Sequence, residues 1–215
     1  MLFPITCVDN FFNSPQEVVK FANSVEYNRT TDVPGFRSKP IHELDIDFFQ
    51  ATTSKMMSVY FPNTWKNTEY EAYSVFQKTS PGTIDGWIHY DSSFFTSIIY
   101  LTDSNVGTSI YHQKKPGILK LDLNKYEYFG NYENYEKEQL QEIKKIRDSS
   151  NDQFEETISI KGKYNRCVQF DGNNYHAAHQ QDEFIEGRER LILITFFNKI
   201  SQSSGRFPTD AYVWY

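Results

Sequence analysis

The sequence has little cysteine, no surplus of positive charge and no long apolar run. Its two cysteines, Cys7 and Cys167, lie far apart without Cys-x-x-Cys spacing. Neither a zinc ribbon nor a disulfide framework is therefore indicated, and a reducing cytosol is the simplest compartment. The formal net charge of -6 argues against a general nucleic-acid binder, because neutralising phosphates requires a basic surface. No segment reaches the ~18 consecutive apolar residues of a membrane span, and the first residues lack the pattern of a signal peptide. We expect a cytoplasmic protein that does not span a membrane.

Aromatic side chains, in contrast, are abundant. With 18 Phe and 15 Tyr, aromatic residues make up 17% of the chain, which favours β-rich packing around a well-filled interior. A length of 215 residues is enough for one core, and no internal repeat is evident. We expect a single domain over residues 1–215, with helical support at 1–70, a strand-rich core at 71–200 and a tail at 201–215.

Residues 1–70 carry helical patterns. The run Ser14-Pro15-Gln16-Glu17 combines a capping serine, a proline in the first turn and a glutamate that completes a capping box. It predicts a helix through about Val25. Proline and glycine between 28 and 41 predict a loop. Apolar residues close to helical spacing over 47–60 predict a second helix, which Phe61-Pro62-Asn63 ends. These helices are expected to brace one face of a sheet.

From residue 71 the pattern changes to short strands separated by polar turns. The predicted strands lie at about 73–78, 87–91, 96–101, 108–111, 157–160, 166–170 and 191–197. Many short strands favour a sandwich or jelly roll, so the expected fold class is mainly β with flanking helices. A charged insertion at about 124–157 interrupts them. Leu140, Ile143 and Ile146 stand three apart among Glu and Lys, which predicts a solvated amphipathic helix, either a plain surface helix or a lid.

The segment His89-Tyr90-Asp91 has the clearest chemical meaning in the chain. Alternate residues of an extended strand point to one face, so the His89 imidazole and the Asp91 carboxylate can converge on a metal ion. The alternative is a surface strand that carries two polar residues, but the apolar neighbours Trp87 and Ile88 favour a largely buried sheet. Two imidazoles and one carboxylate form a facial triad when a second histidine joins this pair.

His176 and Arg190 are expected to complete the site. His176 follows a strand that ends in a turn cluster, and it competes with His179, three residues further on. Arg190 opens a nearly unbroken apolar strand, and a buried strand rarely begins at a cation without a partner for it. Arg188 lies on the same strand face by alternation and is the competing arginine.

In these elements and in their order, the chain resembles the iron(II)/2-oxoglutarate-dependent dioxygenases, and within them the prolyl-hydroxylase-like branch. The matching elements are His-x-Asp at 89–91, strands at 97–102 and 107–111, the segment 170–176, and Arg190 at the head of the last core strand. The resemblance covers roughly residues 70–200 and implies a double-stranded β-helix core, a jelly roll of the cupin type. Two departures are visible. Val106-Gly107 stands where the family often has a Gly-Gly pair, and the charged insertion separates this strand from His176.

The resemblance also implies roles for single residues. The implied ligands of Fe(II) are His89, Asp91 and His176, which leave coordination positions open for 2-oxoglutarate and O2. Arg190 would bind the far carboxylate of 2-oxoglutarate through its planar fork. A tyrosine hydroxyl commonly shares that carboxylate in the family, and Tyr100 is the first candidate and Tyr73 the second.

The implied reaction is hydroxylation of a substrate carbon, with release of succinate and carbon dioxide. Halogenating members of the family have a small residue where this chain has Asp91, so hydroxylation is favoured. The branch resemblance makes a peptidyl prolyl or similar side chain the first substrate guess. Free amino acids, nucleobases and small metabolites stay open, as does the oligomeric state.

Two other classes of protein compete with this interpretation. A cupin-like module would keep the jelly roll and bind a metal or ligand without oxidation, but it has no need for a cation at the barrel mouth. A structural or attachment protein with a β-sandwich would explain the aromatic residues but not the ordered His, Asp, His and Arg. His42 and His112 have no acidic partner at ligand spacing, and we expect both to be ordinary polar histidines.

Overall fold

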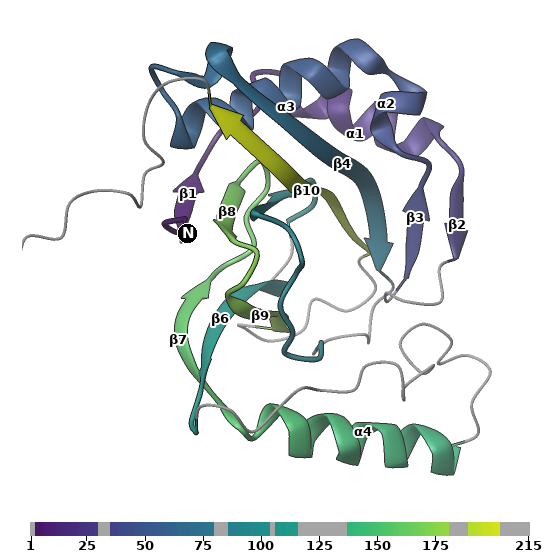
Figure 1. Cartoon of the computed structure of the whole chain (residues 1–215). Coiled ribbons are helices and arrows are strands. Elements are labelled where there is room, and N and C mark those ends of the chain that lie inside the picture. Colours follow the sequence, from purple (N-terminus) through teal and green to yellow (C-terminus); the bar gives the residue numbers. More distant parts are fainter. Residues whose placement is uncertain are drawn as a thin grey trace, which may run out of the picture.

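The strands form two sheets packed against each other (Figure 1). The computed structural model describes residues 3–29, 35–79, 86–103, 106–115, 137–180 and 189–202. The strands are β1 (Thr6–Val8), β2 (Tyr27–Arg29), β3 (Phe36–Ser38), β4 (Thr68–Thr79), β5 (Phe95–Tyr100), β6 (Val106–Gln113), β7 (Phe154–Ile160), β8 (Cys167–Asp171), β9 (Tyr175–Gln180) and β10 (Arg190–Gln202). Within the described residues, the larger sheet has the order β1-β8-β5-β10-β4-β3-β2, and the smaller has the order β7-β6-β9.

Helices cover the outer face of the larger sheet (Figure 1). They are α1 (Pro15–Ser24), α2 (Ile41–Leu44) and α3 (Ile46–Tyr60), followed by the 3-10 turn η1 (Trp65–Asn67). Met56 of α3 is fully buried in one cluster with Phe76 of β4 and Leu193 of β10. The helix α3 begins where the Asp45 carboxylate accepts a hydrogen bond from the Phe48 backbone N–H at 2.8 Å. The predicted second helix and its bracing role are therefore confirmed.

A second apolar core lies between the two sheets. Ile192 and Ile194 of β10 meet Ile98 of β5, Phe170 of β8 and Ile110 of β6 there. Alternate residues of β10, such as Leu193, face the helices instead. Burial on both faces explains why this strand is a nearly unbroken apolar run. The mainly β fold with flanking helices is confirmed.

Two predictions for the N-terminal part are wrong in detail. The Ser14 side chain makes no capping hydrogen bond, and the Glu17 carboxylate pairs with Lys20 at 2.7 Å rather than completing a capping box. The predicted loop at 28–41 overlaps the end of β2 and contains β3, and these two strands pair with each other and extend the sheet beside β4. Strands of three residues are too short to show a period-2 pattern, so they could not be recognised from the sequence.

The segment 87–91 and the insertion also differ from expectation. Within 87–91 only His89 forms a β-bridge, to His176, so the segment lies beside the smaller sheet without becoming a regular strand. The amphipathic helix is present as α4 (Lys137–Asn151), but β7 already begins at Phe154, inside the range assigned to the insertion. Residues 116–136 and the tail after Gln202 lie outside the described residues, and the single domain stays a prediction. None of the helices in the described ranges is both long and apolar enough to cross a membrane.

Candidate metal centre

His89, Asp91 and His176 meet at one end of the space between the sheets. One ligand atom from each lies within 4.8 Å of the others, and no other such group of His, Cys, Asp and Glu occurs among the described residues. The His176 Nε2 atom is 3.5 Å from Asp91 Oδ2, and the His89 Nε2 atom is 3.9 Å from Asp91 Oδ1. The His176 side chain is 7% exposed and that of His89 is 43% exposed. The three donors thus converge on one point that is open to solvent on the His89 side.

Backbone hydrogen bonds hold the two imidazoles in register. The backbone N–H of His89 donates to the His176 carbonyl at 3.0 Å, and the N–H of His176 donates to the His89 carbonyl at 2.7 Å. Each ring also has its Nδ1 atom 2.8 Å from a backbone carbonyl, that of Trp87 for His89 and that of Asn174 for His176. A carbonyl can only accept, so both Nδ1 atoms carry the proton and both Nε2 atoms present a lone pair. Such outer contacts orient metal-binding histidines.

The charges at the site suit a divalent cation. Burial lowers the pKa of His176 to about 4, and the neighbouring His89 acts in the same direction, while Asp91 and the Asn174 carbonyl oppose the shift. The His176 ring is therefore neutral at physiological pH, as a metal ligand must be. Asp91 Oδ2 accepts a hydrogen bond from the Thr96 hydroxyl at 2.5 Å, which fixes the carboxylate toward the two imidazoles.

A close chain crossing places Asp91. The Asp91 backbone N–H donates to the Gly172 carbonyl at 2.7 Å, where the turn after β8 passes the loop that leads into β5. A Cβ atom on Gly172 would lie 2.2 Å from the Ser93 carbonyl oxygen, which is far inside contact distance. Glycine is required here because two backbones touch.

Gly172→Ala should therefore both destabilise the fold and disturb the metal centre. The added methyl group must push the loop that carries Asp91 outward, and overpacking of this kind costs about 2 kcal/mol. Urea unfolding and metal titration measure the two effects. Gly86→Ala is the matched control, because a Cβ there meets nothing closer than 3.7 Å and should change neither quantity appreciably. Equal effects of the two variants would contradict the role given to the crossing.

The end of α4 braces the segment that carries His89. The Asn151 side-chain oxygen accepts from the Ile88 backbone N–H at 3.0 Å, and its side-chain nitrogen donates to the Gly86 carbonyl at 3.1 Å. Asn151 thus satisfies one donor and one acceptor of an extended segment, as a neighbouring strand would. No pattern in the sequence indicated this role for an asparagine at a helix end.

Asn151→Ala is expected to weaken metal binding by about tenfold, at the lower end of the effect of removing an outer partner of a ligand. The loss leaves the N–H of the buried Ile88 without an acceptor. Isothermal titration with Ni(II) measures the affinity. Asn151→Asp keeps the acceptor and should recover part of it, whereas Ser149→Ala, at an exposed position of α4, should behave as wild type. An unchanged affinity in Asn151→Ala would exclude a positioning role.

Arg190 opens β10 on the face that looks into the space between the sheets. Its Cζ atom lies 5.6 Å from the centre of the Tyr100 ring, and the Tyr100 hydroxyl is 2.7 Å from that of Thr108. The residue keeps some exposure overall, but its Nε atom is buried without a hydrogen-bond partner, and no acidic side chain in the described ranges pairs with it. Burial raises the pKa of Tyr100, so the phenol is neutral and its hydroxyl can donate. Thr108 was not anticipated as part of this cluster.

The cluster of Arg190, Tyr100 and Thr108 lies beside the triad, displaced from it by two residues along β6. Thr108 and Ile110 are two residues apart on β6, and Ile110 pairs with His176. At the rise of a β-strand, the Thr108 level and the His176 level are roughly 7 Å apart. A short dicarboxylate can therefore reach from the triad to the guanidinium.

The other predicted residues are placed as follows. Tyr73 does not join the cluster, because β4 brings Thr79 and not Tyr73 opposite Arg190. Tyr73 stands six residues away, about 20 Å along the strand, so its predicted contact with the same carboxylate is wrong. His179 lies on the opposite face of β9 from His176 by strand alternation. Arg188 lies outside the described residues.

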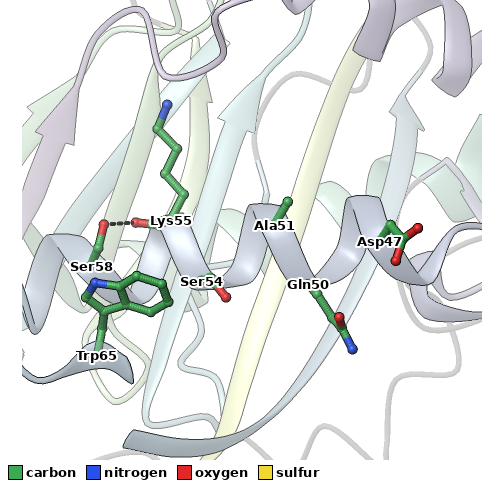
Figure 2. Close-up of a pocket in the computed structure, with 7 residues that line it drawn as sticks. All are labelled: Asp47, Gln50, Ala51, Ser54, Lys55, Ser58 and Trp65. Carbon is green, nitrogen blue, oxygen red and sulfur yellow. Dashed lines mark hydrogen bonds between the residues drawn. The ribbon is translucent and has the colours of Figure 1, made fainter. Parts of the chain in front are cut away.

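The remaining histidines and a surface hollow lie away from the triad. His112 faces Glu155 at 3.4 Å on the surface, and the His42 ring packs edge-on against Phe49. Figure 2 shows the hollow along α3 and η1, lined by Asp47, Gln50, Ala51, Ser54, Lys55, Ser58 and Trp65. It is a shallow, open depression on helices that cover the outer face of the larger sheet, so it takes no part in the candidate centre.

Fold and site together define a double-stranded β-helix with a His-x-Asp…His triad between its sheets. Solved structures with this fold include the non-heme alpha-ketoglutarate-dependent epimerase SnoN from nogalamycin biosynthesis (TM-score 0.53, 11% identity, 96% of this chain and 82% of SnoN covered). They also include EvdO2 from Micromonospora carbonacea var. aurantiaca, complexed with 2-oxoglutarate (0.53, 8%, 98% and 92%). A third is HygX from Streptomyces hygroscopicus, with nickel and 2-oxoglutarate bound (0.55, 7%, 90% and 82%). At these identities the likeness shows the fold, and the predicted double-stranded β-helix is confirmed.

Residues 3–185 match a family described as of unknown function, DUF6445, and the chain belongs to that family. Among curated proteins, none matches the chain. The narrower assignment to a prolyl-hydroxylase-like branch stays a prediction.

Proposed function

We propose that this protein is an Fe(II)/2-oxoglutarate-dependent dioxygenase that hydroxylates a carbon of its substrate. The observation that carries the proposal is the buried, partnerless Nε of Arg190, which lies on the inner surface of the barrel that also holds the triad. A metal centre alone needs no such cation, whereas a dicarboxylate that also binds the metal does. The cupin-like binding module leaves this guanidinium unexplained.

The donor set fits iron. Two neutral imidazoles and one carboxylate on one side of an ion are the facial triad of non-heme Fe(II) oxygenases, with coordination positions left for cosubstrate and O2. Bound iron and 2-oxoglutarate supply the oxidation: R–H, O2 and 2-oxoglutarate yield R–OH, succinate and carbon dioxide. His89, Asp91 and His176 would hold the metal, each fixed by the backbone and hydroxyl contacts described above.

The chain's own share in the reaction is binding and orientation. Arg190 would pair with the far carboxylate of 2-oxoglutarate, and one hydroxyl of the hydrogen-bonded Tyr100–Thr108 pair would donate to it. The apolar residues between the sheets, Ile98, Ile110 and Ile192 among them, would line the cosubstrate and exclude water. The similarity in fold to SnoN, EvdO2 and HygX supports this proposal. A peptidyl prolyl side chain remains the branch-based guess for the substrate, and a cytoplasmic location remains a prediction.

An anaerobic titration of the purified protein with Fe(II) and 2-oxoglutarate tests the proposal. The chelate of 2-oxoglutarate on iron should produce a weak visible charge-transfer band, and admission of O2 should convert 2-oxoglutarate to succinate even without a substrate. The same titration with Zn(II) is the control, since zinc has no such redox chemistry. Absence of the band in wild-type protein would leave the non-oxidising cupin-like module as the better description.

A further inference from the structure

A row of side chains crosses the larger sheet next to the candidate metal centre. Tyr73 of β4 pairs with Phe196 of β10, and Phe196 pairs in turn with Thr96 of β5. Thr96 is the residue whose hydroxyl donates to Asp91. Neighbouring strands are about 5 Å apart, so Phe196 lies one strand and Tyr73 two strands from the level of Asp91.

The two aromatic rings of this row form a platform. They stack with their centres 6.4 Å apart and their planes at 26°. Phe196 packs against the core between the sheets, which places the row on the inner surface of the barrel. Tyr73 nevertheless stays 36% exposed. Exposed aromatic surface on an inner wall beside a reactive centre is typical of a ligand-binding site.

Arg37 of β3 supplies a positive charge above the platform. Its Cζ atom lies 5.9 Å from the centre of the Phe196 ring. Its Nε donates to the Gln77 side-chain oxygen at 2.9 Å, and Gln77 is itself buried. Arg37 and Gln77 pair directly across the two strands, so both side chains are on the inner face. The cation is thus fixed by a built contact rather than extended into solvent.

This cation serves a different part of the inner surface from Arg190. Arg190 pairs with Thr79 at one end of β4 and covers Tyr100, whereas the guanidinium of Arg37 reaches toward Phe196, in the row beside Asp91. Two separate guanidinium groups on one inner wall can bind two different anions.

We infer that Arg37, Tyr73 and Phe196 form the subsite for the primary substrate, which is a small organic anion with a flat apolar body. This inference rests on the proposed function, because it takes Arg190 to be occupied by 2-oxoglutarate. The substrate's carboxylate or phosphate pairs with the planar fork of Arg37, and its body lies over the Tyr73 ring. The carbon presented to the metal is then on the Asp91 side. Such a substrate differs from the prolyl side chain of a peptide, which brings no anion to Arg37.

Binding of two matched probes tests the inference. Phenylacetate and phenylacetamide have the same ring, and only the first carries a charge. In titrations of the Ni(II)- and 2-oxoglutarate-loaded protein followed by ligand-observed NMR, phenylacetate should bind at least about tenfold more tightly, as expected for one charged hydrogen-bonded contact. This comparison needs no variant, so loss of folding cannot obscure it. Equal binding of the two probes would overturn the inference and leave the proposed function intact.

Variants then assign the preference to a residue. Arg37→Gln should abolish the preference for phenylacetate. Tyr73→Ser should weaken the binding of both probes and preserve the preference. The matched control is Arg29→Gln, because the Arg29 guanidinium also lies over a ring, that of Phe36, 5.5 Å away on the opposite face of the same sheet. It should have no effect. A preference that survives in Arg37→Gln would refute the subsite.

Arg190→Gln separates the inference from the proposed function. In metal-free protein, Arg190→Gln should retain the preference for phenylacetate that Arg37→Gln loses. Loss of the preference in Arg190→Gln instead would show that the probe occupies the cosubstrate position, and the subsite would be rejected. If the wild-type protein forms no charge-transfer band when titrated with Fe(II) and 2-oxoglutarate but still shows a preference that depends on Arg37, the anion site is supported and the oxygenase is rejected.

Discussion

Replacement of His176 by alanine is expected to abolish the iron and 2-oxoglutarate chelate and, with it, the formation of succinate. His176 is the most deeply buried of the three candidate ligands, and its Nε2 lies 3.5 Å from the Asp91 carboxylate. Loss of an outer partner of a ligand already costs up to about a hundredfold in metal affinity, and loss of the ligand itself should cost more. The charge-transfer band during anaerobic titration and succinate after admission of O2 measure the two consequences.

His179→Ala is the matched control for this variant. His179 is three residues further along β9 and faces the other side of the strand, so its removal deletes an imidazole without touching the triad. It should retain the band and the turnover. Thermal unfolding of the metal-free forms checks that both variants fold. A band of wild-type intensity in His176→Ala would remove this residue from the centre and return His179 as the second histidine.

Arg190→Gln is expected to lower the affinity for 2-oxoglutarate by about a hundredfold and to leave the affinity for the metal nearly unchanged. Pairing of a guanidinium with a carboxylate in a buried site is worth about 3 kcal/mol, and 1.4 kcal/mol corresponds to a factor of ten. Because the Nε of Arg190 is buried without a partner, its replacement breaks no existing hydrogen bond at that atom. Titration of 2-oxoglutarate into the Ni(II)-loaded protein and of Ni(II) alone separates the two affinities.

Thr108→Val provides a graded comparison for Arg190. Valine has almost the same shape as threonine, so the variant removes only the hydroxyl that contacts Tyr100. The affinity for 2-oxoglutarate should fall by about tenfold or less, as for the loss of a single hydrogen bond. Equal losses of metal and 2-oxoglutarate in Arg190→Gln would contradict the assignment, because a clamp on the cosubstrate acts on one ligand only. Arg188 would then be the arginine to replace.

The sequence was sufficient to identify the triad because each ligand stands at a place where local pattern is informative. His89 and Asp91 alternate beside buried Trp87 and Ile88, and His176 follows a strand that ends in a visible turn. Arg190 could be singled out because a cation at the head of an apolar strand breaks the pattern around it. Each of these signals comes from residues that are close together in the sequence, so it can be recognised without knowledge of the fold.

Contacts between distant segments were beyond reach from sequence. Asn151 binds the segment at 86–88 through a helix end, and Gly172 matters only because Ser93 passes within contact distance. The predicted contact of Tyr73 with the carboxylate bound by Arg190 failed for the same reason. The position of Tyr73 relative to Arg190 depends on the register of β4 against β10, and the sequence of either strand alone does not contain that register.

Because the backbones of His89 and His176 bond each other, the candidate metal centre lies at a contact between two distant segments of the barrel. The two residues lie far apart along the chain. They become neighbours only when the segment around His89 pairs with β9 of the smaller sheet. In the unfolded chain the three donors are far apart. A metal ion can bind them together there only if the chain between them closes into a loop, which costs conformational entropy. A metal present at a hundred times its dissociation constant would therefore stabilise the folded chain by about 2.7 kcal/mol. A rise in resistance to denaturant on addition of metal is therefore a further measure of occupancy of the candidate centre.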